Sequence, residues 1–163
     1  MDASICRDHL NCLLGEEAAA LTELEAILGR EYAHIISDNL EDLEKASAAR
    51  DACMSTLLRI DSERQSLCHA SGYNADKSGL LQLINWCDPS GAIQTRWQQS
   101  TAAIRNCRAL NDRNGALVNN RLKRVEGMLN SLNGTEHSNS RVYSARGNTY
   151  QNPQAGRVCH IQA

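Results

Sequence analysis

Apolar residues between Ile93 and Leu132 recur at alternating steps of three and four residues. This spacing keeps one row of side chains on one face of a helix, and it is typical of a helix that lies along partner helices. The predicted row consists of Ile93, Trp97, Ser100, Ile104, Cys107, Asn111, Asn114, Val118, Arg121, Val125, Met128 and Leu132. Asp88 and Pro89 are typical of a helix N-cap and its first residue. We therefore predict one long helix over about 89–132.

The predicted row becomes polar in its middle. Asn111 and Asn114 both fall on it, and Gly115 follows. Two amides and a glycine lower helix propensity and apolar burial, so stability is given up at this point. One interpretation is that a buried Asn selects the pairing of helices. The other is that the helix keeps a groove for a partner or crosses another helix closely.

Two more long helices are predicted before this one, over about 3–36 and 39–70. The first carries two rows with a spacing of seven residues, Leu14, Leu21, Leu28, Ile35 and Leu10, Glu17, Leu24, Glu31. Asp38 and Glu41 fit a capping box that starts the second helix, with Asp38 as its N-cap. A linker of one or two residues between helices of this length forces an antiparallel hairpin.

The rest of the chain is a short connector and a polar tail. Leu80, Leu83 and Ile84 predict a short helix over about 78–86, and residues 133–163 are rich in Ser, Asn, Gln and Gly. Such a composition buries too little apolar surface to fold alone. The predicted fold is all-α: an elongated antiparallel helical bundle of three long helices over 1–132, with a short connector helix and a flexible C-terminal tail. The tail either has no role or carries a docking motif around Val142 and Tyr143.

Composition and charge narrow the function. The chain has no Phe and 4% aromatic residues, which suits thin seams between helices better than a thick core. Its net charge of −2 combines −8 over residues 1–45 with +5 over residues 91–132, so the first and last long helices are electrostatically complementary. A nucleic-acid-binding domain usually carries a strongly basic total and interleaved aromatic residues, which argues against that class of partner.

No catalytic or metal-binding pattern is present in the sequence. The seven cysteines include no C-x-x-C pair, and the five histidines are scattered. Free cysteines within helices behave as small apolar residues in a reducing compartment. The apolar runs are too short for a transmembrane helix, and Met1-Asp2 does not begin a secretory signal. We therefore expect a protein that is not an enzyme, uses no cofactor or metal, and does not insert into a membrane.

Three short motifs occur in order along the chain. Leu13-Leu14-Gly15-Glu16-Glu17 lies in the first helix, Asn111-Asp-Arg-Asn114-Gly115 in the third long helix, and Val142-Tyr143-Ser-Ala-Arg-Gly147 in the tail. With this order, the chain resembles the FlgN family of bacterial flagellar export chaperones over essentially its whole length. The resemblance implies a cytoplasmic type III export chaperone that binds flagellar hook-associated proteins of the hook–filament junction, prevents their premature assembly and delivers them to the flagellar export gate.

The resemblance also implies where the partners bind. In the family, the C-terminal part of the chaperone captures the amphipathic C-terminal helix of the client, and a tail tyrosine docks on the cytoplasmic domain of the export gate. By motif, the client-binding residues here are Asn111, Asn114, Gly115, Leu117 and Val118. The gate-binding residue is Tyr143, whose ring could instead fold back onto the bundle.

A different class of function also fits the heptads. A structural coiled-coil adaptor or scaffold subunit would pair its seams permanently with copies of itself or with another protein. Seams of such an adaptor should stay apolar. In this chain the seams include the polar residues Glu17, Arg50, Asn111 and Arg121. A monomer or weak homodimer is expected of a chaperone, and a stable oligomer of an adaptor.

Overall fold

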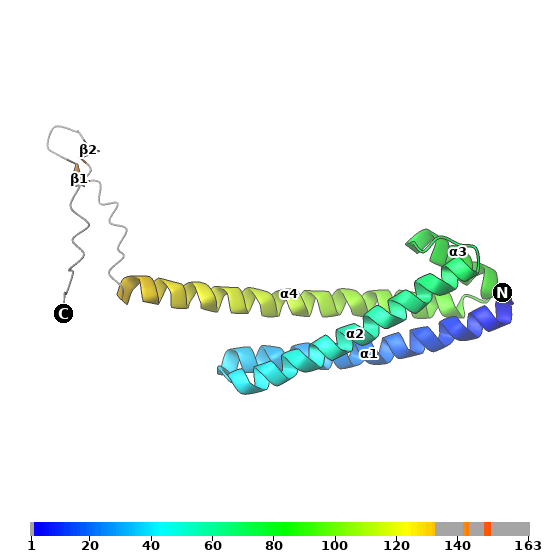
Figure 1. Ribbon diagram of the computed structural model, residues 1–163, viewed down its shortest axis with the longest axis horizontal. Coiled ribbons are helices and arrows are strands. Elements are labelled where there is room, and N and C mark those ends of the chain that lie inside the picture. The colour runs from blue at the N-terminus through cyan, green and yellow to red at the C-terminus, as the bar shows by residue number, and fades with distance from the viewer. Residues whose placement is uncertain (1, 133–141, 144–148, 151–163) are drawn as a thin grey trace, which may run out of the picture. The chain divides into compact units, whose positions relative to one another are not determined.

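Helices make up nearly all of the protein that its computed structural model describes, which is residues 2–132, 142–143 and 149–150 (Figure 1). The elements are α1 (Ala3–Ser37), α2 (Leu40–Ala70), α3 (Lys77–Cys87), α4 (Ala92–Leu132), β1 (Val142–Tyr143) and β2 (Thr149–Tyr150). The predicted helical class is confirmed. The chain divides into two compact units, Met1–Leu122 and Lys123–Ala163.

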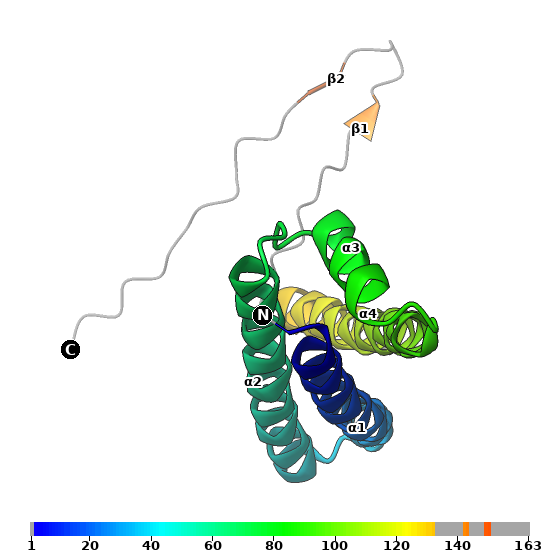
Figure 2. The ribbon, with the colours of Figure 1, turned by 90° about the vertical axis from the view of Figure 1, so that its right-hand side faces the viewer.

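In the first unit, α1 lies between α2 and α4 (Figure 2). Both of its predicted rows are buried, including Glu17 and Glu31, and a third row of Leu13, Ala20 and Ile27 is buried as well. Three rows cover more than half of the circumference of a helix, so α1 contacts helices on two sides. It is therefore the central helix of this unit.

The helix α2 runs antiparallel to α1, as predicted from the short linker. Glu17 of α1 pairs with Arg64 of α2, and Glu31 pairs with Arg50, so the order of the partners is reversed along α2. The buried row of α2 repeats every seven residues and consists of Ala46, Cys53, Ile60 and Leu67. Much of the remaining surface of α2 is exposed, which fits a helix that packs along one stripe.

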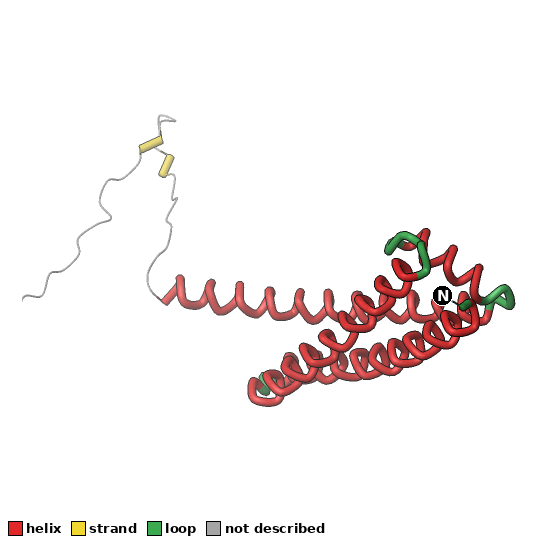
Figure 3. The backbone as a smooth tube through the Cα atoms, turned by 45° about the vertical axis from the view of Figure 1, so that its right-hand side comes forward, coloured by secondary structure: helices red, strands yellow, loops and turns green. Residues whose placement is uncertain are grey.

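The short helix α3 packs across the end of the unit at which α1 begins and α2 ends (Figure 3). Leu83 is fully buried. Burial of a leucine side chain stabilises a fold by about 1.5–3 kcal/mol, so this end is a substantial part of the core. The cluster around it joins α1, α3, the end of α2 and the start of α4, and consists of Cys6, Leu10, Leu14, Leu67, Cys68, Leu80, Leu83, Ile84, Cys87 and Ile93.

The cap between α1 and α2 differs by one residue from the prediction. Asp38 ends α1 in the left-handed conformation, with φ of 56°, and its N–H donates to the carbonyl of His34. Asn39 is the N-cap of α2, and its side-chain oxygen accepts from the N–H of Asp42 at 3.2 Å. The prediction of Asp38 as N-cap was therefore wrong. Asp and Asn both cap helices and both tolerate the left-handed region, so the sequence pattern does not separate the two roles.

The start of α4 also differs from the prediction, because α4 begins at Ala92 and not at Pro89. Pro89 lies in a turn that ends at Gly91, which has φ of +79°. Asp88 still caps α4 from a distance: its carboxylate accepts from the N–H of Ile93 at 2.8 Å and from the N–H and hydroxyl of Ser90. These hydrogen bonds, led by the one from Ile93, hold the pKa of Asp88 below its usual value.

The second unit contains the last turns of α4 and one short pair of strands. β1 and β2 pair antiparallel, with Val142 opposite Tyr150 and Tyr143 opposite Thr149. This pair of strands was not predicted from the sequence, although Val, Thr and Tyr favour strands. The prediction of a flexible tail over 133–163 otherwise falls on residues outside the described part of the chain.

Gly79 offers a test of the packing of α3. A Cβ at this position would lie 2.1 Å from the backbone oxygen of Asn74, whereas a Cβ at Gly29 of α1 would meet nothing within 4 Å. We expect Gly79→Ala to destabilise the protein by about 1–3 kcal/mol, because the backbone must shift. Gly29→Ala should stabilise it by about 0.5–1 kcal/mol through helix propensity. Urea unfolding followed by circular dichroism measures both changes in stability. If both variants were destabilised, or both stabilised, the result would contradict this packing.

Asp88 gives the fold a predictable response to acid. Because its pKa is lower in the folded state than in the unfolded chain, ionised Asp88 stabilises the fold above about pH 4, and this contribution is lost as the pH falls through the lowered pKa. The Asp88→Asn variant cannot lose a charge. Between about pH 5 and pH 3, wild type should therefore lose more stability than Asp88→Asn, measured as the fall in the urea midpoint. Parallel losses in the two proteins would show that the Asp88 carboxylate does not hold the start of α4.

Candidate functional site

Two buried carboxylates of α1 organise the interior of the first unit. Glu17 lies 2.9 Å from the Arg64 guanidinium of α2, which also contacts Asp61 at 2.6 Å. The same guanidinium lies 4.7 Å from the centre of the Trp97 ring of α4, within the range of a cation–π contact. The side chains of Glu17 and Arg64 are 5% and 12% exposed. One polar layer therefore joins α1, α2 and α4.

A second polar layer repeats this arrangement farther along α1. Glu31 is buried and lies 3.2 Å from Arg50 of α2. Asn114 of α4 is also buried, and its side-chain amide donates to the carbonyl of Leu28 at 2.8 Å and to the Glu31 carboxylate at 3.5 Å. These hydrogen bonds fix the position of α4 against α1, so they support the interpretation in which a buried Asn selects the pairing of helices.

The contact of α4 with α1 is narrow and largely polar. The buried residues of α4 form one row with a spacing of seven, Ile93, Ser100, Cys107 and Asn114. Asn106 donates to Glu25 at 2.8 Å, and Arg121 pairs with Asp38 and donates to the carbonyl of Ile36. The partners follow the same order in both helices, so α4 runs parallel to α1. The acidic and basic helices predicted to be complementary are neighbours in this unit.

The predicted client-binding residues do not share one environment. Asn114 lies in the interior, Leu117 is half-buried and Val118 is 38% exposed. A Cβ at Gly115 would meet nothing within 4 Å, so no close helix crossing among the described residues explains this glycine. Asn111 is exposed, and its predicted place on the buried row was wrong. The side chain of Tyr143 lies outside what the structure describes.

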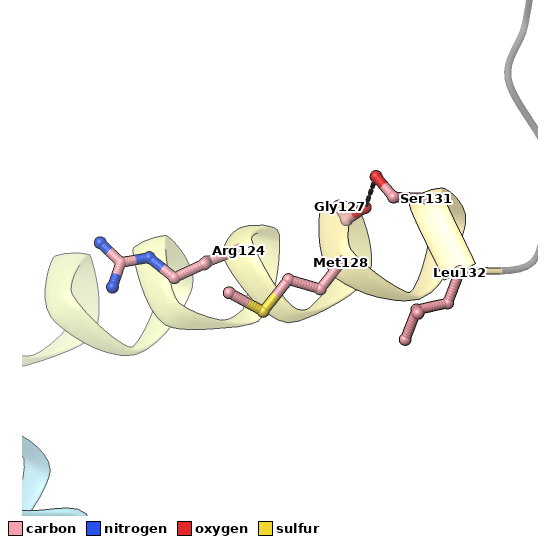
Figure 4. A pocket seen from close by; sticks show the side chains of 5 residues that line it. All are labelled: Arg124, Gly127, Met128, Ser131 and Leu132. Atoms are coloured by element: carbon pink, nitrogen blue, oxygen red, sulfur yellow. Dashed lines mark hydrogen bonds between the residues drawn. The ribbon is translucent and has the colours of Figure 1, made fainter.

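In the second unit, the end of α4 carries an exposed apolar strip, which we define as Val125, Met128, Leu129 and Leu132. Each of these residues is at least half exposed, from 51% for Leu129 to 82% for Leu132. Met128 and Leu132 project from the same side of the helix and line a shallow hollow with Arg124, Gly127 and Ser131 (Figure 4). The sequence pattern placed three of the four residues on the row predicted to lie along partner helices, whereas all four are exposed.

The exposed apolar strip continues a pattern that the sequence analysis missed. Val118, Leu122, Val125, Leu129 and Leu132 follow one another at steps of four, three, four and three, and all are exposed. This second row shares Val118, Val125 and Leu132 with the predicted row and adds two leucines. The signal that would have revealed it is the pair Leu122 and Leu129. Clustered exposed apolar residues of this kind mark interaction surfaces more often than scattered ones do.

The cysteines of the first unit are packing residues. The six described cysteines are all free, and five of them are buried. Cys53 and Cys107 donate to the carbonyls of Ala20 and Leu21 at 3.1 and 3.6 Å. Burial raises the pKa of both thiols, and it raises the pKa of Cys87 to about 12. These thiols therefore stay protonated at neutral pH. Among the described residues, no group of side chains is suited to bind a metal ion.

A cavity of about 230 Å³ lies between α2, α3 and α4 beside the first polar layer. Apart from Lys77, its charged lining already has structural partners. Arg64 is shared by Glu17 and Asp61, and Asp76 caps α3 by accepting from the N–H of Gly79 at 2.7 Å. The cavity therefore offers a ligand few free polar groups from these residues, and the exposed apolar strip is the stronger candidate for a functional site.

Comparison with known proteins gives one match. The family model described as FlgN protein matches residues 7–151, which is most of the chain. No curated protein and no solved structure matches. Within the part of the chain that the structure describes, no helix has an apolar stretch long enough to cross a membrane.

The two polar layers predict an asymmetry between neighbouring arginines of α2. Arg64→Ala leaves the buried Glu17 without its cation and should cost about 3–5 kcal/mol. Arg59→Ala removes an ion pair with Glu16 in which both side chains are exposed. This variant should barely change the urea midpoint. Replacing both Glu17 and Arg64 with Leu should restore most of the stability lost in Arg64→Ala. Equal midpoints for the two single variants would contradict the structural role of the buried layer.

Proposed function

The chain belongs to the FlgN family of flagellar export chaperones, and on that premise we propose that it binds hook-associated proteins, keeps them unassembled and delivers them to the flagellar export gate. The observation that carries the proposal is the exposed apolar strip at the end of α4. A chaperone of this kind acts in the cytoplasm on a client before export. It needs no nucleotide or metal for capture, because the apolar surface buried on binding supplies the affinity.

The exposed apolar strip suits a helical client. Residues at steps of three and four present one continuous ridge, which an amphipathic helix covers with its own apolar face. The proposed client segment is the C-terminal amphipathic helix of a hook-associated protein. Partial exposure in the free chaperone favours reversible capture, because binding then requires no unfolding of the bundle.

The residues given by the family motif take different roles in this proposal. Val118 is exposed and precedes the exposed apolar strip on α4, so it is proposed to contact the client together with Leu117. Asn111 and Gly115 are exposed on the same helix and remain proposed contacts. Asn114 is proposed to act indirectly, because its amide is committed to Leu28 and Glu31.

Delivery is proposed to use Tyr143. This residue belongs to β1, and its motif is the one that the family uses for docking on the cytoplasmic domain of the export gate. A tyrosine offers a large contact area and one hydroxyl at low cost in side-chain entropy, which is why it often anchors interfaces. Client binding and gate docking then rest on different segments of the chain.

A structural coiled-coil adaptor is the alternative function, because the exposed apolar strip could also pair with a permanent partner. Light scattering after size-exclusion chromatography separates the two functions. A chaperone should be a monomer or weak homodimer across the concentration range, and an adaptor should be a stable oligomer.

Substitution of the exposed apolar strip tests the client site. We expect Val125→Asp with Leu129→Asp to weaken capture of a hook-associated protein at least tenfold, because two charges would be buried against the apolar face of the client. The matched control is Met54→Asp with Leu58→Asp, which changes an equally exposed apolar pair on α2. Isothermal titration measures both, and circular dichroism checks the helicity. Wild-type affinity in a folded strip variant would place the client elsewhere.

Tyr143 and Tyr150 lie on opposite strands of the same pair and allow a matched test of docking. Tyr143→Ala should weaken binding to the cytoplasmic domain of the export gate at least fivefold while client affinity stays unchanged. Tyr150→Ala should retain most of the gate affinity. If both variants bind the gate as wild type does, the docking proposal fails; a fall in melting temperature alone would indicate that the Tyr143 ring packs on the bundle.

A further inference from the structure

Arg124 is one of several cations of the described helices that form no ion pair with a described residue, and it is the one that lines the hollow beside the exposed apolar strip. It is exposed, and its guanidinium forms no ion pair or hydrogen bond with any residue that the structure describes. Charged pairs on a helix form between residues three or four apart. The residues at those distances from Arg124 are Asn120, Arg121, Gly127 and Met128, none of which is an acid.

Some other cations of the described helices do have such partners. Lys45 pairs with Glu41 and Asp42, which lie four and three residues away. Arg59 pairs with Glu63 in the same way. Arg121 has no acid at these distances but is held by Asp38. Arg105 of α4 also lacks an acid at these distances, so Arg124 is distinguished by its place beside the exposed apolar strip and not by the missing anion alone.

Arg124 lies on one flank of the exposed apolar strip. It precedes Met128 by one helical turn and lines the hollow with Met128 and Leu132, where Gly127 leaves room beside the ridge (Figure 4). A helix that covers the strip would bring its own flank against Arg124 and remove water from the guanidinium. Covering a charge without an opposite charge is unfavourable, so the partner must supply an anion at this place.

We propose that the exposed apolar strip recognises an amphipathic helix that carries a carboxylate beside its apolar face, and that this carboxylate pairs with Arg124. The proposal deepens the proposed function, because it names the chemical class of the client helix. Arg124 then acts as a specificity-determining residue, since a partner with Lys or Arg on the same flank is rejected by like charge.

A second copy of this chain is a poorer occupant than an acidic helix. Between Ala92 and Leu132 the helix carries seven bases and two acids, so two copies of α4 would bring the same surplus of positive charge together. An acidic partner is attracted by that surplus, which also speeds encounter at low ionic strength. Charge complementarity therefore favours a different molecule with acidic flanks.

The test uses two designed peptides with one apolar stripe, one flanked by Glu and the other by Lys, and the full-length chain. Fluorescence anisotropy at low ionic strength should show that wild type prefers the Glu peptide by roughly fivefold or more. Arg124→Glu should abolish or invert this preference. Arg105→Glu, the matched control, makes the same charge change at an exposed arginine of the same helix away from the strip and should leave the preference in place.

Several other outcomes would overturn the inference. Equal affinities of wild type for the two peptides, or a preference that survives in Arg124→Glu, would remove the specificity role. An equal effect of Arg105→Glu would assign the preference to the overall charge of α4. Binding of neither peptide by a chain that dimerises through the strip, detected by sedimentation, would make a second copy the occupant. If hook-associated protein is not captured but the peptide preference holds, the proposed function fails while this inference stands.

Discussion

The buried ion pairs Glu17–Arg64 and Glu31–Arg50 hold α1 and α2 in one alignment, and the remaining structure of the first unit depends on them. The two glutamates are two heptads apart on α1, and the two arginines are two heptads apart in the opposite direction on α2. A slip of α2 by one heptad would place Leu57 opposite one of the carboxylates. An unpaired buried charge costs several kcal/mol, far more than the loss of one apolar contact. The polar layers thus specify the hairpin more sharply than the leucines do.

The same layers determine how α4 binds to α1. Its buried row alternates apolar and polar residues, and Asn114 joins the layer of Glu31 through the amide. A helix attached along one narrow row keeps most of its circumference exposed. For a chaperone this is useful, because a surface that folding does not consume remains available to a client. The polar contact with α1 and the exposed apolar strip therefore both follow from the narrow row along which α4 is attached.

Much of the helical architecture could be predicted from heptad spacing. The rows of α1 were predicted because Leu, Ile and Glu recur every seven residues, and the extent of each helix followed from Gly, Pro and Asx residues near its ends. The caps were misplaced where two residues compete for one role, as at Asp38 and Asn39, or where a carboxylate acts across a turn, as at Asp88. Those choices depend on backbone conformation, which a linear pattern does not contain.

The candidate site was predictable only in part. A seam pattern shows that Val125, Met128 and Leu132 lie on one helix face, but it does not show whether another helix covers that face, so their exposure could not be predicted. Asn111 belongs to the companion row of Trp97, Ile104 and Val118, whereas α4 buries only the single row of Ile93, Ser100, Cys107 and Asn114. A linear pattern does not show which of the two rows faces a neighbour. The function rests on the family match together with the exposed apolar strip, which spacing alone would have interpreted as core.

Hydrogen exchange of the full-length chain, free and in complex with a hook-associated protein, tests the central claim most directly. If the end of α4 is the capture surface, backbone amides of residues 123–132 should exchange at least tenfold more slowly in the complex, because covering the exposed apolar strip suppresses local opening of these turns. Amides around Glu17 and Glu31 should change little, since the polar layers are already formed in the free chain. Protection that appears along α2 while residues 123–132 exchange as before would contradict the account.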